Sequence, residues 1–177
     1  MAGSRLRVKM FIRNHSYRIT MSLLERLGEY LSWADTAIWE IVKDLSDEEF
    51  DRSFGEYGGS IRKRYTHLAE DAWEWYHDWI GKHPEQEPDF QNMTREQLFD
   101  SLSDYSHRFI EMIDHRTVEE IELKTAGKTT PLSFDEFLFH IVNHATYHRG
   151  QIAMGLRMLD KKVRMTDYIP FRKDTVE

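Results

Sequence analysis

Apolar residues recur at intervals of three and four along most of the chain, which is the spacing of one face of an α-helix. The pattern predicts four helices of about 20 residues, the first starting between Ser16 and Ser22 and ending near Lys43, the others spanning about Ser60 to Ile80, Thr94 to Ile113 and Phe134 to Leu159. Ser60 is a plausible N-cap, and Thr94 and Ser133 each begin a capping box. We therefore predict an all-α four-helix bundle.

The segments between these stretches read as turns and loops. Residues 44–50 indicate a helix stop followed by a capped turn, and residues 51–60 and 82–93 are loops that contain Gly or Pro. Apolar and acidic residues alternate from Val118 to Leu123, which predicts a short extended or hairpin connection between the third and fourth long helices. The tail, residues 160–177, is expected to be mostly irregular.

Charge divides the 177-residue chain into two parts. Residues 1–20 hold five cations and no acid, and we interpret them as a basic N-terminal extension, expected to be flexible. Residues 21–177 form the predicted bundle and bring the net charge to −7, which argues against nucleic-acid binding. No segment approaches the roughly 20 apolar residues of a membrane helix, and no signal peptide is apparent, so we expect a cytoplasmic protein without a membrane partner.

Three histidines on the fourth long stretch are the candidate functional residues. His140, His144 and His148 follow one another at intervals of four, so each lies about 40° from the next around the helix. By this angle His148 falls within the apolar stripe, His144 at its margin, and His140 toward the polar side. Two imidazoles at this spacing can reach one metal ion, and the chain has no Cys to compete as ligand.

A third ligand must come from another helix. His67 is the best candidate because it flanks the apolar stripe of the second stretch, with Asp71 one turn further on. The spacing alone also fits histidines that are hydrogen-bonded in the core or at its boundary. A zincin site is disfavoured because Ala145 stands where the general-base Glu is required, and a di-iron site because His77 belongs to a single Glu-x-x-His motif and lies off the apolar stripe.

Residues 139–152, which read FHIVNHATYHRGQI, closely resemble the C-terminal signature of the DinB-like family. These are four-helix metal-binding proteins whose fold is shared with bacillithiol and mycothiol transferases. Shorter segments, in the family's order and spacing, extend the resemblance over about residues 21–172; they are residues 31–35, 45–50, 66–71 and 166–171.

The resemblance implies that His67, His144 and His148 bind a divalent metal ion, zinc or nickel, with water in the open positions. It leaves His140 outside the ligand set and implies a homodimer. It also suggests a metal-dependent thiol S-transferase that joins a low-molecular-weight thiol to an electrophilic substrate, with Asp71 or Asn143 orienting a ligand. Two alternatives stay open, a non-catalytic dimeric metal-binding or stress-response module and a metal-dependent hydrolase, for which the sequence identifies no general base.

Overall fold

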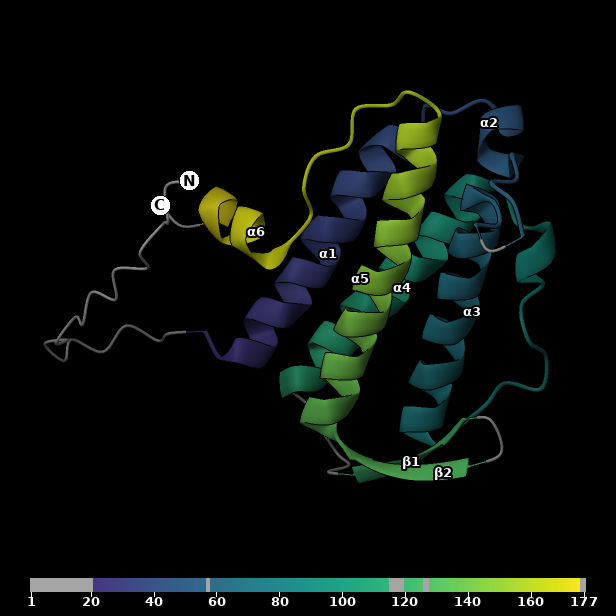
Figure 1. The fold of residues 1–177 in the computed structure, drawn as a ribbon. Coiled ribbons are helices and arrows are strands. Elements are labelled where there is room, and N and C mark those ends of the chain that lie inside the picture. The colour runs from purple at the N-terminus through teal and green to yellow at the C-terminus, as the bar shows by residue number, and fades with distance from the viewer. Residues whose placement is uncertain (1–20, 57, 115–119, 126–127, 176–177) are drawn as a thin grey trace, which may run out of the picture.

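Four long helices form the body of the protein in a computed structural model that describes residues 21–56, 58–114, 120–125 and 128–175. They are α1 (Leu23–Val42), α3 (Ile61–Ile80), α4 (Arg95–Asp114) and α5 (Phe134–Met158) (Figure 1). Shorter elements are α2 (Asp47–Asp51), the 3-10 helix η1 (Phe90–Asn92) and α6 (Tyr168–Thr175). The predicted four-helix bundle is confirmed, and the predicted basic extension, residues 1–20, lies outside the described residues.

The helices begin where local chemistry satisfies their first backbone N–H groups. Ser22, Ser46 and Ser133 each form a complete capping box with the Glu three residues later. Ser60 caps α3 through its hydroxyl, and Gly81 ends that helix with φ 63°, a left-handed conformation that favours glycine. These caps confirm the predicted helix starts at Ser60 and Ser133 and the predicted capped turn at residues 46–50.

The helices are arranged so that α1 and α3 occupy opposite corners of the bundle. Helix α1 packs against α4 and α5, and α3 packs against the same two helices from the other side. The centre is filled by large apolar side chains from all four helices and from α2, η1 and α6; the largest fully buried ones are Phe50, Phe90, Phe109, Phe137, Phe171, Ile38, Ile61, Leu98, Leu138, Ile152, Leu156 and Val42. The contact between α3 and α5 is the one that positions the histidines.

An antiparallel hairpin joins α4 to α5, which confirms the predicted extended connection. Strand β1 (Glu120–Thr125) pairs with β2 (Lys128–Ser133), and Glu120 lies opposite Ser133. Because α4 and α5 stand at opposite corners, the hairpin crosses the end of the bundle (Figure 1). Leu123 of β1 is buried, at 7% exposure.

The tail differs from the prediction, because residues 168–175 form helix α6 instead of irregular chain. Phe171 anchors this helix; it is 1% exposed and its ring lies 5.7 Å from the rings of Tyr30 and Trp33 on α1. The Tyr30 hydroxyl also donates a hydrogen bond to the Thr166 carbonyl at 2.9 Å. Eight residues with one buried anchor carry too little periodicity to be recognised from sequence, and packing on α1 supplies the rest.

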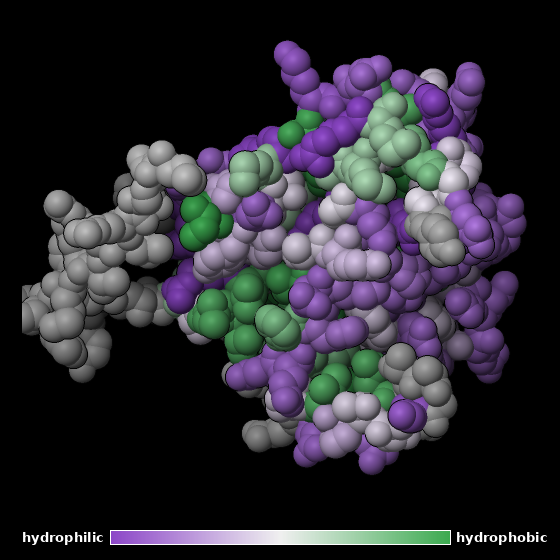
Figure 2. All heavy atoms as spheres, in the orientation of Figure 1, coloured by the Kyte–Doolittle hydropathy of each residue, from purple (hydrophilic) through white to green (hydrophobic). Residues whose placement is uncertain are grey.

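The surface over α1 and α5 is mainly hydrophilic, with separate apolar areas (Figure 2). Four apolar residues of α5 are at least half exposed, namely Phe139, Tyr147, Met154 and Met158. Among the helices of the described ranges, none combines the length and the apolarity needed to cross a membrane.

Candidate metal centre

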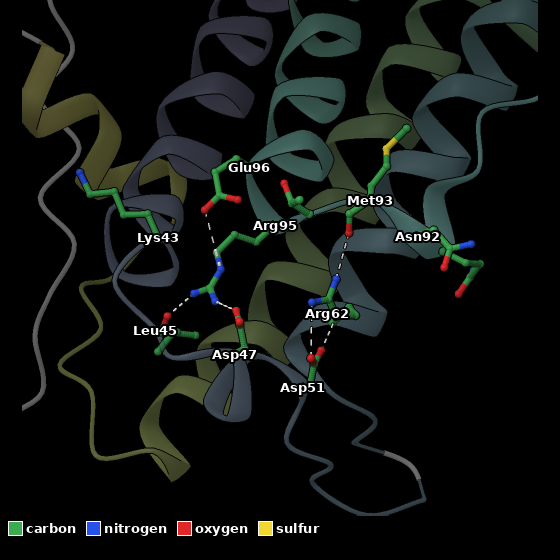
Figure 3. A pocket seen from close by; sticks show the side chains of 11 residues that line it. Lys43, Leu45, Asp47, Asp51, Arg62, Asn92, Met93, Arg95 and Glu96 are labelled. Carbon is green, nitrogen blue, oxygen red and sulfur yellow. Dashed lines mark hydrogen bonds and ion pairs between the residues drawn. The ribbon is translucent and has the colours of Figure 1, made fainter.

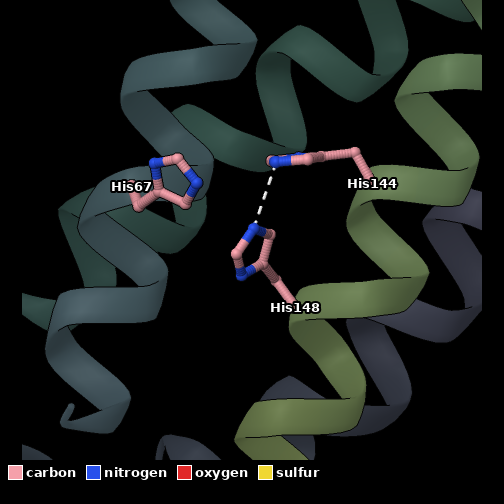
Figure 4. A group of neighbouring side chains, drawn as sticks. All are labelled: His67, His144 and His148. Carbon is pink, nitrogen blue, oxygen red and sulfur yellow. Dashed lines mark hydrogen bonds between the residues drawn. The ribbon is translucent and has the colours of Figure 1, made fainter. Parts of the chain in front are cut away.

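Helices α3 and α5 bring three imidazole rings together (Figure 4). His67 comes from α3, and His144 and His148 come from successive turns of α5. One nitrogen of each ring lies within 4.8 Å of a nitrogen of the other two. The Nε2 atoms of His144 and His148 are 3.1 Å apart, and the ring of His67 lies 4.6 Å from that of His148. The structure therefore places the three sequence-predicted residues at one point.

On α5, His148 is more deeply buried than His144, as the helix geometry predicted, and His67 on α3 is the most exposed of the three rings. His148 is 5% exposed, the His144 side chain is 19% exposed, and the His67 side chain forms the outer edge at 39%. His140 is outside this group of three; its ring instead packs against Trp75 at 4.8 Å. Trp75 also contacts His144 at 4.9 Å and so shields one side of the centre from water.

Burial favours the neutral form, which a metal ion requires, for the imidazoles of His144 and His148. Burial and then the neighbouring rings lower the pKa of His144 to about 4. Burial also lowers the pKa of His148, although its hydrogen bond to Gln151 acts in the opposite direction. His148 Nε2 carries a lone pair because the ring proton is on Nδ1, and this lone pair lies at hydrogen-bond distance, 3.1 Å, from His144 Nε2, where a proton or a metal ion can lie between the two nitrogens.

The donor set fits a divalent ion. Two nitrogen ligands about 2.0 Å from a tetrahedral metal lie about 3.3 Å apart, close to the 3.1 Å observed between the two Nε2 atoms. The opposite ring nitrogen of His148 is held, because its Nδ1–H donates to Gln151 Oε1 at 2.9 Å. That bond selects the tautomer whose Nε2 faces the other rings.

Asp71 lies beside the centre, as its position one turn after His67 predicted. One carboxylate oxygen is 3.4 Å from His67 Nδ1, and the other is 3.4 Å from His144 Nε2. Burial raises the pKa of the Asp71 carboxyl to about 6, against the attraction of His67. The carboxylate therefore contacts two of the three rings and stands where a proton acceptor is useful.

Asn143, the other residue predicted to orient a ligand, is exposed on α5. Gln151, and not Asn143, makes the hydrogen bond that orients His148. Its position was readable in principle, because a residue three places after His148 lies on the same face of the helix.

A buried ion pair behind the centre was also missed. Arg149, 2% exposed, donates from Nη1 to Asp35 Oδ1 on α1 at 2.7 Å, and from Nη2 to Thr146 Oγ1 at 2.8 Å. Charged residues are expected at the surface, so neither was assigned to the core. The pair joins α5 to α1 immediately next to His148 and so fixes the position of the metal-facing helix.

The prediction for His77 was wrong in one respect. His77 does not lie off the apolar face; it is buried at 9% exposure and its Nδ1–H donates to the Trp73 carbonyl at 2.7 Å. The reason is an aromatic layer between α3 and α4, in which Trp73, Tyr76 and Tyr105 surround the ring. His77 lies near the opposite end of α3 from His67 and belongs to the core.

The fold and the centre define a class of protein, helical bundles in which facing helices bring three histidines to one point that can hold a metal ion. Residues 18–175 match the model of the DinB family. The chain belongs to the DinB family.

Two proteins of Bacillus subtilis illustrate the relationship. The chain is 29% identical over 157 residues to Protein DinB of strain 168, an alignment that covers 81% of this chain and 90% of that protein. Its fold is similar to that of YfiT, described as a probable metal-dependent hydrolase with an unusual four-helix bundle topology. That similarity has a TM-score of 0.61 at 14% identity and covers 85% of this chain and 97% of YfiT.

Proposed function

We propose that this protein binds one divalent metal ion, zinc or nickel, through His67, His144 and His148 and uses it to transfer a low-molecular-weight thiol to an electrophile. The observation that supports this most is the convergence of three imidazoles next to a carboxylate. Three protein ligands leave a coordination position for a substrate, which is typical of catalytic sites. Since the chain has no Cys, the thiol is supplied by a substrate.

A bound divalent ion supplies Lewis acidity and lowers the pKa of a thiol or a water molecule toward neutrality. The chain's own groups do the rest. Gln151 holds His148 in the required tautomer, and Trp75 keeps water from one side of the rings. In the transfer, a sulfur–carbon bond forms while the bond to the leaving group breaks, and Asp71 carries the thiol proton toward that leaving group.

Hydrolysis is the second candidate, and two observations favour it. Asp71 supplies the general base that the sequence alone did not identify, and its carboxylate is 3.4 Å from His144 Nε2. YfiT, which shares the fold, is described as a probable metal-dependent hydrolase. Water then takes the place of the thiol as nucleophile, with the same ligands and the same proton acceptor.

One assay separates the two reactions. Metal-loaded protein is incubated with 1-chloro-2,4-dinitrobenzene, with and without bacillithiol, glutathione or coenzyme A, and the products are identified by mass. Thiol transfer predicts a thioether and chloride that depend on both thiol and metal, whereas attack by water gives dinitrophenol. Asp71→Asn, which keeps the shape of the side chain, is expected to slow the reaction by about a hundredfold. If neither product forms with any thiol or electrophile, the enzymatic proposal fails and a non-catalytic metal-binding protein is left.

The homodimer is part of this proposal. The four exposed apolar side chains of α5 supply a face that a second copy can cover. Light scattering of the purified protein tests it, and we expect a mass twice that of the 21.2 kDa chain. A monomer at high concentration contradicts the dimer without affecting the metal site.

A further inference from the structure

A groove of about 540 Å³ borders His67 on the side of the first turns of α3. Its lining contains three consecutive cations and one acid; the residues are Ser60, Arg62, Lys63, Arg64, Thr66, His67, Glu70 and Gln91. The acid, Glu70, accepts a hydrogen bond from Gln91 at 2.7 Å. The lining is thus positive overall in a chain whose net charge is −7.

The three cations differ in how far their charges are already used. Arg62 pairs with Asp51 and donates to the Met93 carbonyl at 3.0 Å, so it is held by the protein. Lys63 is exposed, and it makes no ion pair with any residue in the described ranges. Its ammonium is therefore available to a ligand.

Arg64 connects the groove to the metal centre. It lies three residues before His67, about 4.5 Å along the same helix. One guanidinium nitrogen donates to the Gly58 carbonyl at 3.1 Å, which anchors the residue. An anion placed in the groove would be attracted by Lys63 and Arg64 while lying next to a metal ligand.

We infer that this groove binds an anionic group, a carboxylate or a phosphate, on the substrate whose reacting group is delivered to the three histidines. The inference rests on the proposed function, because it assumes that a substrate comes to the centre. Ammonium and guanidinium groups form charge-assisted hydrogen bonds with such oxygens. A positive groove in an acidic protein also draws an anionic substrate toward one site and away from the rest of the surface. The protein is therefore selective for negatively charged substrates.

The test compares two thiols with the same mercaptopropionyl chain, 3-mercaptopropionate, which ends in a carboxylate, and its uncharged methyl ester. Each is titrated into cobalt-loaded protein, and the sulfur-to-metal absorption band reports binding. We expect the wild type to bind the acid about tenfold more tightly than the ester, as one or two charge-assisted contacts give. Lys63→Glu is expected to abolish this preference. Lys82→Glu, the same change at an exposed position after the other end of α3, is expected to retain it.

Measuring the metal content separates a failure of the anion-binding inference from a failure of the proposed metal site. The anion-binding inference is overturned if metal-loaded wild type binds acid and ester equally, or if Lys63→Glu keeps the preference for the acid. Either result leaves the proposed function intact. If the protein binds no metal, the proposed function fails, and the groove is tested alone in metal-free protein with pyrophosphate by the amide NMR shifts of residues 60–67. Saturable shifts that Lys63→Glu removes support the anion site, and their absence overturns it.

Discussion

Two regions of this protein gather titratable side chains, and they differ in how these side chains are paired. The first is a pocket of about 740 Å³ where the α1–α2 corner meets η1 and the start of α4 (Figure 3). The second is the cluster of three histidines between α3 and α5 (Figure 4). The pocket is more highly charged, yet the histidine cluster is the better candidate for chemistry.

In the pocket, each charge has found a partner within the chain. Three cations and three carboxylates line it. Arg95, whose side chain is 9% exposed, donates to the Leu45 carbonyl and pairs with Asp47, while Arg62 pairs with Asp51. The guanidinium of Arg95 thus closes the α1–α2 corner onto α4.

In the histidine cluster the rings contact one another. Two Nε2 atoms face each other at 3.1 Å, and the Nδ1 atom of His144 has no hydrogen-bond partner among the described residues. Buried polar atoms without partners also occur in the Asp35–Arg149 pair, so what sets the cluster apart is that ring nitrogens of three histidines lie within 4.8 Å of one another. The comparison teaches that a candidate metal site is recognised by converging ligand atoms and not by charge alone, and four measurements can break or sharpen it.

The largest expected effect is on metal affinity. His67→Ala removes one of three ligands and is expected to weaken zinc binding by about a thousandfold, measured by competition with a chromophoric chelator. His140→Ala is the matched control, because His140 stands one turn from His144 but outside the ligand group. If both variants bind zinc as tightly as wild type, the cluster is not a metal site.

The second effect is the pH dependence of stability in the metal-free protein. The pKa of His144 is about 4 in the folded chain and 6.5 in a model imidazole. The unfolded chain therefore binds a proton between these values that the folded chain does not, so stability is full above pH 6.5 and is lost as the pH falls toward 4. The loss attributable to His144 is up to about 3 kcal/mol.

Urea unfolding in the presence of a chelator measures this loss. His144→Gln, which has no titrating ring, should show a flatter profile between pH 7 and pH 4.5. An equal loss in the variant would place the acid sensitivity elsewhere in the protein.

The third effect is a loss of stability when a charge pair in the pocket of Figure 3 is broken. Arg95→Met removes the guanidinium donor of the buried Leu45 carbonyl and is expected to lower the free energy of unfolding by about 2 kcal/mol. Metal content should not change, because the pocket stabilises the fold and contains none of the three histidines. Arg108→Met is the control: Arg108 pairs with Asp104 on the surface of α4 and should cost less than about 0.5 kcal/mol. A loss of metal in Arg95→Met would show that the two regions are coupled.

The smallest effect concerns Gln151. Gln151→Ala removes the acceptor that holds His148 Nδ1 and is expected to weaken zinc binding about tenfold. Gln151→Glu keeps an acceptor at the same reach and should bind zinc within about threefold of wild type. Unchanged affinity in Gln151→Ala would mean that helix packing alone orients the ring.

The helices and their caps were predictable because their signals are local. Ser60, Ser133 and Gly81 act within one helical turn, and the angle between His144 and His148 follows from helix geometry. The meeting of His67 with α5 depends on which helices are neighbours, which spacing does not determine; the resemblance to the family supplied it.

The remaining differences have tertiary causes. Asp35 and Arg149 are buried because each neutralises the other across α1 and α5. His77 is buried by two rings of its own helix together with Tyr105 of α4, and α6 forms because Phe171 packs on α1. Each of these depends on a partner distant in sequence, so no local pattern indicates it.

The most direct test of the account is the metal content of protein purified without a histidine tag, wild type beside His148→Ala. The account predicts close to one equivalent of zinc or nickel per wild-type chain and almost none in the variant, with both proteins folded. Metal-free wild type that stays folded and takes up no added zinc or nickel would contradict it. The three histidines would then be ordinary residues of the helical bundle.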